Sequence, residues 1–332
     1  MFESTLPQTC ATGIVADPVC KDHVTGPGHP ERRERFDAVM EGLGRSGLLE
    51  RLVKIEPRVA NKNELLLCHR ADYLEEVKEA ILGGAEELDG GDTRVCAESW
   101  EAALHAAGGI LNAVDAVAEE RVGNAFCVVR PPGHHASAAR AMGFCIFNNV
   151  AIAARYAQTK HGLKRALIVD WDVHHGNGTQ DIFYEDGSVF FFRTHQSPWY
   201  PGTGPAQETG AGAGKGTTLN CPLPAGSGRK EIFHAFREKL VPAADAFRPD
   251  IVFISAGFDS RMDDPLGSFT LSDADFAELT GIVAGIARKY AGGRLVSVLE
   301  GGYNLRGLAE ASCAHMKALI EAAGTGEVLN KI

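Results

Sequence analysis

The sequence lacks a long apolar run, an excess of basic residues and closely spaced cysteine pairs, and each absence excludes a class of protein. No apolar stretch approaches the roughly 20 residues that a membrane-spanning helix needs. Lys and Arg number 33 against 43 Asp and Glu, a formal net charge of −10, so no basic surface is available to neutralise nucleic-acid phosphates. We therefore expect neither a membrane nor a nucleic acid as a direct partner.

The eight cysteines are scattered along the chain without a Cys-x-x-Cys pair. This spacing disfavours a disulfide framework and a cysteine-based zinc site, and it favours reduced thiols. The first residues also lack the charged and apolar regions of a signal peptide. Together these features predict a cytoplasmic protein.

Four short apolar runs, rich in β-branched residues, predict buried parallel strands over residues 125–129, 166–169, 251–255 and 295–299. Amphipathic segments alternate with them and predict helices over residues 31–43, 64–82, 98–119, 149–159, 230–240, 272–290 and 305–322. Pro242 should stop or kink the chain after the fifth helix. This alternation predicts an α/β fold with a mostly parallel central sheet.

All four strands lead into chemically reactive side chains. The second runs into residues 170–179, where Asp172 and His174 point the same way if strand geometry persists. The other three run into the pair His134 and His135, into Asp259, and into Tyr303. Ligands bind outside the carboxyl ends of the strands in open α/β sheets, so the four ends predict one site. Length alone would allow two domains, but dividing the chain would divide this site, and we predict one domain over residues 1–332.

The residue types at these strand ends are those of a hydrolytic metal site. Asp172, His174 and Asp259 supply three ligands and leave a fourth position open, as in catalytic zinc sites. His134 and His135 suit acid–base work near neutral pH, and Tyr303 can donate to an oxyanion. Each residue also has a structural interpretation, a surface His pair or a simple turn. For any one residue that structural interpretation is plausible. It is not plausible for all of them together, because every one of these residues would then follow a strand of the same sheet by accident.

These residues resemble the zinc-dependent histone deacetylase family, in particular its class II-like bacterial amidohydrolases and acetylpolyamine amidohydrolases. The resemblance covers nearly the whole chain, through residues 25–32, 130–135, 143–149, 170–178, 200–204, 255–259, 263–267 and 300–304. It implies the arginase-like α/β fold, with helices on both faces of the sheet. Arginases hold two manganese ions, whereas the residues here fit a single zinc better.

The resemblance also implies a role for each site residue. Asp172, His174 and Asp259 would bind Zn²⁺, and the activated water would attack an acyl carbonyl. His135 would act as general base, His134 as an electrostatic and orienting group backed by Asp170, and Tyr303 as the oxyanion donor. Asn177 departs from relatives that carry Asp at this position, and this predicts a His135 that is more easily kept neutral.

The substrate is less constrained by the sequence. Phe144, next to Gly143, and Tyr200 would flank a narrow tunnel, although ordinary core aromatics are the alternative. Leu266 occupies the position where polyamine-specific relatives carry a glutamate, which favours an acylated lysine peptide over an acetylated polyamine. An acidic loop with Asp92 could replace that glutamate, hold a peptide backbone, or be a solvated turn. A catalytically silent binder of acylated ligands is a third possibility.

A structural K⁺ is implied beside Asp170, where many relatives carry a serine and this chain has Arg193. The guanidinium could displace that ion, or Arg193 could turn outward, or backbone oxygens could still hold K⁺. A second K⁺ near Phe183, Asp186 and Val189 is implied more weakly. The sequence carries no signal for oligomeric state.

Overall fold

The computed structural model describes residues 11–324, which fold around one eight-stranded sheet. Every strand pair is parallel, in the order β2-β1-β3-β8-β7-β4-β5-β6. The strands are β1 (Thr12–Val15), β2 (Leu52–Lys54), β3 (Asn124–Cys127), β4 (Ala166–Asp170), β5 (Val189–Gln196), β6 (Thr218–Leu223), β7 (Ile251–Ala256) and β8 (Leu295–Leu299). The predicted parallel sheet is confirmed.

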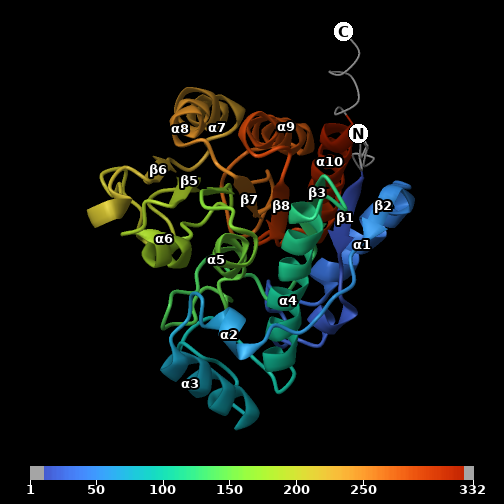
Figure 1. The fold of residues 1–332 in the computed structure, drawn as a ribbon. Helices are drawn as coiled ribbons and strands as arrows, with labels where there is room; N and C mark the ends of the chain where they lie inside the picture. The colour runs from blue at the N-terminus through green and yellow to red at the C-terminus, as the bar shows by residue number, and fades with distance from the viewer. Residues whose placement is uncertain (1–10, 325–332) are drawn as a thin grey trace, which may run out of the picture.

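Helices cover both faces of the sheet (Figure 1). One layer contains α7 (Arg229–Ala235), α8 (Val241–Phe247), α9 (Asp273–Tyr290) and α10 (Leu305–Gly324), with α1 (Glu34–Arg45) packed against α10. The other contains α4 (Ser99–Ala118), α5 (Asn149–His161) and α6 (Asn177–Phe183), with α2 (Lys62–Leu65) and α3 (Ala71–Leu82) further out. Double coverage explains why the central strands are apolar without alternation, since every residue of β3, β4, β7 and β8 is buried.

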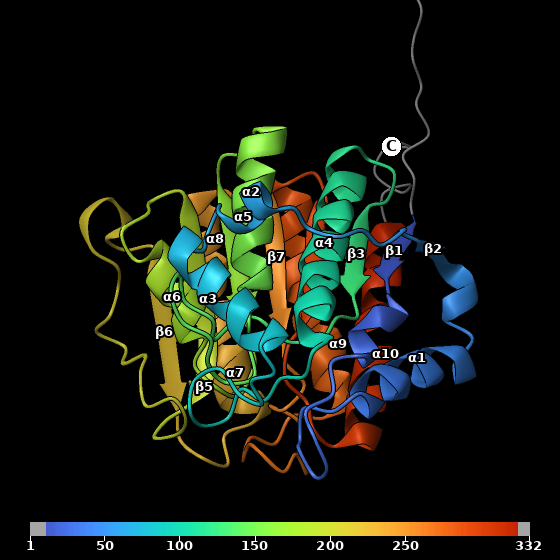
Figure 2. The same ribbon diagram turned by 90° about the horizontal axis from the view of Figure 1, so that it is seen from below.

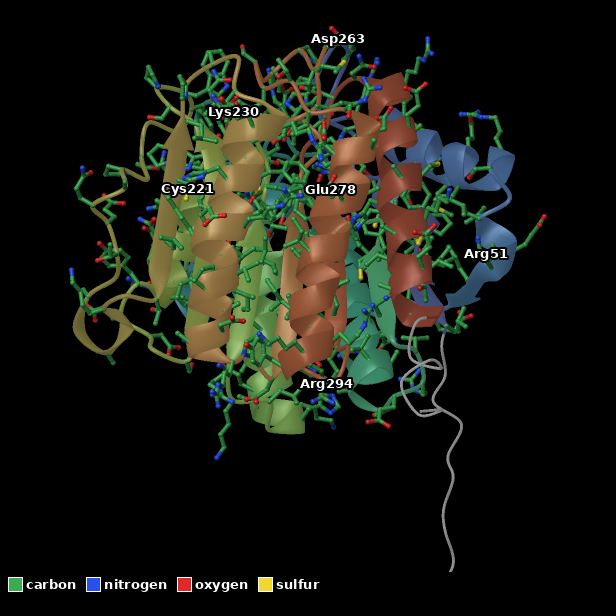
Figure 3. The ribbon with its side chains drawn as sticks, turned by 90° about the horizontal axis from the view of Figure 1, so that it is seen from above. Arg51, Cys221, Lys230, Asp263, Glu278 and Arg294 are labelled. Carbon is green, nitrogen blue, oxygen red and sulfur yellow. The ribbon has the colours of Figure 1, made fainter. Side chains whose placement is uncertain are left out.

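The four predicted strands are consecutive neighbours, β3-β8-β7-β4. Because the sheet is parallel, all four carboxyl ends meet at one edge, toward which the strand arrows point in Figure 2. Figure 3 marks the two edges: Asp263, in the loop after β7, lies at one end of the molecule, and Arg294, just before β8, lies at the other. The strand order therefore brings the reactive residues together.

Two predicted helices differ from the structure. Residues 64–82 form two helices, because the Arg70 N–H donates to Ala138 O over 2.8 Å and His69 Nε2 accepts from Asn148 N over 2.9 Å. These distant partners replace the hydrogen bonds of a continuous helix. After α7, a π-helical turn over Phe236–Leu240 leads into α8, which holds Pro242 in its first turn. The helical path is continuous here, since the Val241 N–H donates to Phe236 O. The wider π-helical turn therefore accompanies Pro242, which has no N–H to donate.

No helix among residues 11–324 is both long and apolar enough to cross a membrane. The seven cysteines within that range are free thiols.

Two helical glycines should respond oppositely to alanine. A Cβ added at Gly281 in α9 would meet no atom within 4 Å, whereas one at Gly108 in α4 would lie 2.1 Å from Arg58 O. Gly281→Ala should raise the free energy of unfolding by about 0.5–1 kcal/mol through helix propensity. Gly108→Ala should lower it by about 1–3 kcal/mol through overpacking. Urea denaturation measures both, and shifts in the same direction would contradict the packing described here.

Candidate active site

Asp172, His174 and Asp259 come together at the carboxyl ends of β4 and β7. One ligand atom from each lies within 4.8 Å of the others, and all three residues are buried. His174 Nδ1 is 3.1 Å from Asp172 Oδ1 and 3.2 Å from Asp259 Oδ2. The structure thus brings the three predicted ligands to one point.

Backbone N–H groups fix the remaining carboxylate oxygens. Gly301 N donates to Asp172 Oδ2 over 2.9 Å, and Val173 N donates to Asp259 Oδ1, also over 2.9 Å. Gly301 must approach closely to do this, because an added Cβ would lie 2.1 Å from Asp259 Oδ2 and 2.6 Å from Asp172 Oδ2. Gly301, which follows β8, therefore helps to hold the two carboxylates of the ligand cluster in place.

The electrostatics of this cluster favour a cation. Burial and the neighbouring charge of Asp172 raise the pKa of Asp259 to about 7. Two carboxylates this close and this buried are costly unless positive charge compensates them. Two carboxylate oxygens and one imidazole nitrogen are a donor set that zinc accepts, with an open position for a water or a substrate.

Two adjacent histidines lie beside the cluster, each held by one hydrogen bond. His134 Nδ1 donates to Asp170 Oδ2 over 3.1 Å, and His135 Nδ1 donates to Asn177 Oδ1 over 2.8 Å. Their ring centroids are 4.1 Å apart. Because Nδ1 carries a proton in this arrangement, Nε2 is the nitrogen through which either ring would gain or lose a proton.

The two imidazoles differ in charge. Burial lowers the pKa of His134, but the carboxylates of Asp172 and Asp170 outweigh it and raise the pKa to about 9. Burial together with the charges of His134 and His174 lowers the pKa of His135 well below its usual value. The site therefore pairs a cationic imidazole with a neutral one that can accept a proton.

Tyr303 is buried two residues after Gly301. Its ring centroid is 5.9 Å from that of Phe144, and the Arg35 guanidinium lies 5.0 Å from the Tyr303 centroid. Burial raises the pKa of Tyr303 well above its usual value, so the phenol stays protonated. Within residues 11–324 its hydroxyl makes no hydrogen bond, which leaves it available to donate to a substrate oxygen.

Glu300 is a supporting residue that sequence reasoning did not assign. Its buried carboxylate accepts from Gly133 N over 2.7 Å, from His134 N over 3.1 Å and from the Ser255 hydroxyl over 3.0 Å. It therefore fixes the loop that carries the two histidines. Its place directly after β8, where the other strands carry functional residues, was a signal that could have identified it.

Buried arginines support the Tyr303 loop. Arg35 Nε donates to Gly302 O over 2.7 Å, and Arg35 Nη1 donates to Glu31 Oε1 over 3.1 Å. Glu31 also accepts from Arg130 Nη2 over 2.6 Å. Nothing in the sequence distinguished Arg35 from its neighbours at 32 and 33, which are exposed.

The aromatic residues predicted to flank a tunnel lie at the mouth of the site. The Tyr200 ring centroid is 5.3 Å from that of His135 and 6.1 Å from that of His174. Tyr200 is 37% exposed, so it is a rim residue and not an ordinary core aromatic. Phe144, on the side of Tyr303, is partly exposed.

The acidic loop reaches the same rim but its carboxylates are engaged. Asp92 Oδ1 accepts from Gly143 N over 3.1 Å, which ties the loop to the backbone beside Phe144. Asp89 accepts from the N–H groups of Gly91, Asp92 and Thr93. Leu266 lies in the loop after β7 and is partly exposed. Its carbonyl accepts from Nε1 of Trp199, next to Tyr200 in the sequence, over 2.8 Å.

Arg193 turns inward. It is fully buried on β5, beside Asp170 on β4, and its Nη1 donates to Asp170 Oδ2 over 3.2 Å. The sequence left open whether the Arg193 side chain points inward or outward, and the structure shows that it points inward. The alternative in which the side chain points to solvent is wrong.

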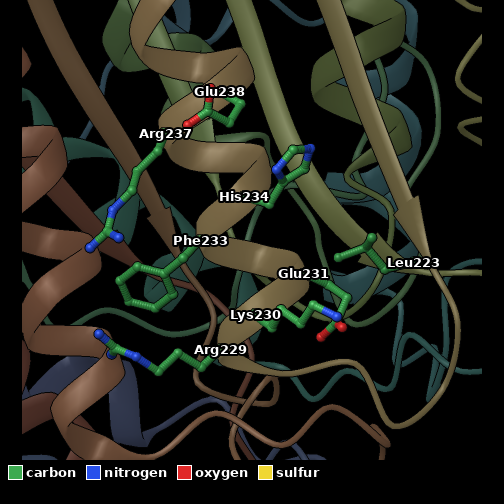
Figure 4. A pocket seen from close by; sticks show the side chains of 8 residues that line it. All are labelled: Leu223, Arg229, Lys230, Glu231, Phe233, His234, Arg237 and Glu238. Carbon is green, nitrogen blue, oxygen red and sulfur yellow. The ribbon is translucent and has the colours of Figure 1, made fainter.

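A separate surface pocket of about 860 Å³ lies along α7 and the end of β6 (Figure 4). Phe233 lies between the guanidinium groups of Arg229 and Arg237, at 4.4 and 5.2 Å from its ring centroid. Both guanidiniums pair with Glu278. None of the lining residues belongs to the ligand cluster, so this pocket is not part of the site.

A family model described as the histone deacetylase domain matches residues 29–319. The chain belongs to the histone deacetylase family. It is therefore a deacetylase, which is a kind of hydrolase, as the sequence resemblance implied. The crystal structure of the HDA15 HD domain superposes with a TM-score of 0.89 at 37% identity and covers 94% of this chain and 90% of that chain. The predicted deacetylase-like fold is confirmed.

Two curated relatives of this chain are named for different activities. A "probable deacetylase" of Archaeoglobus fulgidus is 42% identical over 299 residues, which cover 89% of this chain and 82% of the relative. "Polyamine deacetylase HDAC10" of Homo sapiens is 42% identical over 301 residues, which cover 87% of this chain and 44% of the relative. The chain therefore spans less than half of the human protein.

Replacing Asn177 by Asp should shift the pH dependence of turnover. A carboxylate on His135 Nδ1 would stabilise the charged imidazole and raise its pKa. The neutral base would then be lost at a higher pH, so the acidic limb of kcat/KM on an acetylated substrate should move up by about one pH unit. An acidic limb at the wild-type position, in a variant with unchanged unfolding, would contradict this account of His135.

Proposed function

We propose that this protein is a zinc-dependent deacylase that removes acetyl or related acyl groups from lysine side chains of peptides or proteins. The observation that supports this most is the convergence of three metal ligands, a neutral imidazole and a free phenol at one strand edge. Its mouth is flanked by aromatic rings.

Asp172, His174 and Asp259 would hold the zinc. Bound there, Zn²⁺ would polarise the acyl carbonyl and lower the pKa of a water at the open position. The two carboxylates suit this role because positive charge offsets their burial. Gly301 N and Val173 N hold Asp172 Oδ2 and Asp259 Oδ1. The other oxygen of each carboxylate lies beside His174 Nδ1 and would be the one that binds the ion.

The other residues move protons and stabilise charge. His135 would accept the proton of the attacking water on Nε2 and deliver it to the leaving amine. His134, cationic beside Asp170, would stabilise the negative charge that develops nearby. Tyr303 would donate a hydrogen bond from its phenol to the oxyanion; removal of one such donor typically costs about 10²–10³ in rate.

The rim favours acyl-lysine over acetylpolyamine. A polyamine places a second ammonium near the entrance, where a carboxylate would recognise it. Asp89 is saturated by its own loop, Asp92 accepts from Gly143 N, and Leu266 offers no charge. The acetylpolyamine alternative keeps support from the human relative named a polyamine deacetylase.

A silent binder is the weakest candidate, since the three metal ligands, the base and the oxyanion donor are all present. We also propose a cytoplasmic location. The seven cysteines of the described residues are free thiols, which are typical of a reducing compartment.

The proposal is tested by side-by-side rates on acetyl-lysine peptide, trifluoroacetyl-lysine peptide and acetylspermidine, with zinc-loaded and chelator-treated protein. Turnover should require zinc, favour the peptides and fall about 10²–10³-fold in Tyr303→Phe. Zinc-dependent preference for acetylspermidine would overturn the substrate and keep the mechanism. Zinc binding without turnover on any of the three would favour the silent binder.

A single rim substitution should change the substrate preference. Leu266→Glu would place a carboxylate where the distal ammonium of a polyamine arrives, and it should raise the kcat/KM ratio of acetylspermidine to acetyl-lysine peptide at least about tenfold. The matched variant Leu266→Gln has a similar shape without the charge and should leave the ratio near that of wild type. Equal ratios in both variants would show that Leu266 does not face the bound substrate.

A further inference from the structure

We infer that Arg193 is a built-in cation that occupies the place of the structural potassium ion implied by the family resemblance. The carboxylate of Asp170 and the main-chain carbonyls of Asp172, His174 and Thr194 converge on its guanidinium. Nη1 donates to Asp170 over 3.2 Å, and Nη2 donates to the carbonyls of Asp172 over 3.2 Å, of Thr194 over 3.3 Å, and of His174.

The cradle would suit an alkali ion if the guanidinium were absent. Carbonyl and carboxylate oxygens that converge from one side are the ligands that such a hard cation takes. Here the position is filled. Space around it is closed as well, since a Cβ added at Gly176 would lie 3.0 Å from Arg193 Nη1 and 2.5 Å from Asp170 Oδ2. A potassium ion therefore does not fit beside Asp170 in this chain.

The register of the sheet fixes the guanidinium in this place. Arg193 on β5 pairs with Asp170 on β4, the residue that begins the ligand-bearing loop. From there the side chain reaches the carbonyls of Asp172 and His174, whose side chains are two of the three proposed zinc ligands. Arg193 also shares the Asp170 carboxylate with His134. It is therefore a positioning residue, which holds the loop without touching the substrate.

A covalently attached cation cannot be removed by dialysis. Wild-type protein should therefore have the same unfolding temperature and the same kcat/KM in potassium as in tetramethylammonium chloride of equal ionic strength. A small side chain at position 193 should empty the cradle and create a site for an added ion.

The experiment compares wild type with Arg193→Ser, Arg193→Lys and the control Arg58→Ser. Arg58 also pairs with a carboxylate, Glu64, over 2.7 Å. Its other acceptors are the Asn112 side chain and one main-chain carbonyl, that of its neighbour Val59, so no group of main-chain carbonyls converges on it. Unfolding temperature is read by calorimetry in tetramethylammonium, lithium, sodium and potassium chlorides, and kcat/KM in the same salts.

Arg193→Ser should unfold at a lower temperature in tetramethylammonium and recover in a saturable way with potassium, more than with lithium. Its kcat/KM should rise at least several-fold over the same titration. Arg193→Lys keeps a fixed charge and should respond less than Arg193→Ser. Arg58→Ser should lose stability without any response to potassium.

Two results would overturn the inference: wild type that gains stability or activity specifically from potassium, or folded Arg193→Ser that gains nothing from it. If Arg193→Ser fails to fold in every salt, the potassium response of wild type and Arg193→Lys decides the question. The inference assumes the proposed zinc deacylase site only in its kcat/KM readout. Because unfolding temperature does not depend on turnover, failure of the proposed function and failure of the inference are distinguishable.

Discussion

The site depends on how the fold stabilises negative charge that is buried at one edge of the sheet. Five carboxylates there are at most 8% exposed: Asp170, Asp172, Asp259, Asp264 and Glu300. Isolated carboxylates cannot be buried so deeply without large cost. Since the edge collects the carboxyl ends of parallel strands, the loops that leave those strands supply N–H donors at short range. The fold therefore creates both the charge cluster and much of its stabilisation.

Three kinds of group with positive charge or partial charge act at this edge: backbone N–H groups, buried guanidiniums and the proposed metal ion. Backbone N–H groups bind oxygens that must not move, as Gly301 N does for Asp172. Fixed guanidiniums hold main-chain loops, as Arg35 does at Gly302 and Arg193 at His174. The proposed metal ion would be needed only beside Asp172, His174 and Asp259. In this arrangement guanidiniums attached to the chain position the loops, and the proposed ion would supply the charge used in catalysis.

The sequence predicted the sheet and the convergence of Asp172, His174 and Asp259 because these depend on local rules: apolar runs form buried strands, and parallel strands end together. It did not predict the break at residues 64–82, because Arg70 and His69 find partners at Ala138 and Asn148, far along the chain. Nor did it predict which arginines turn inward. A guanidinium is buried only where several acceptors already converge, and that convergence is a property of the assembled fold.

Catalysis and substrate choice rest on different physics in this molecule. Both carboxylate oxygens of Asp172 accept a backbone hydrogen bond, from His174 N and from Gly301 N, and Gly301 packs closely against them. The side chains proposed to meet the substrate at the mouth are more exposed: Tyr200 is 37% exposed, and Leu266 is partly exposed. One apolar contact there is worth about 1.5–3 kcal/mol when fully buried, far less than the 8 kcal/mol or more by which enzymes typically lower a barrier. Under the proposed function, discrimination between an acylated peptide and an acylated polyamine would therefore rest on a few residues at the mouth of the site, and the same metal-ligand cluster would serve either substrate.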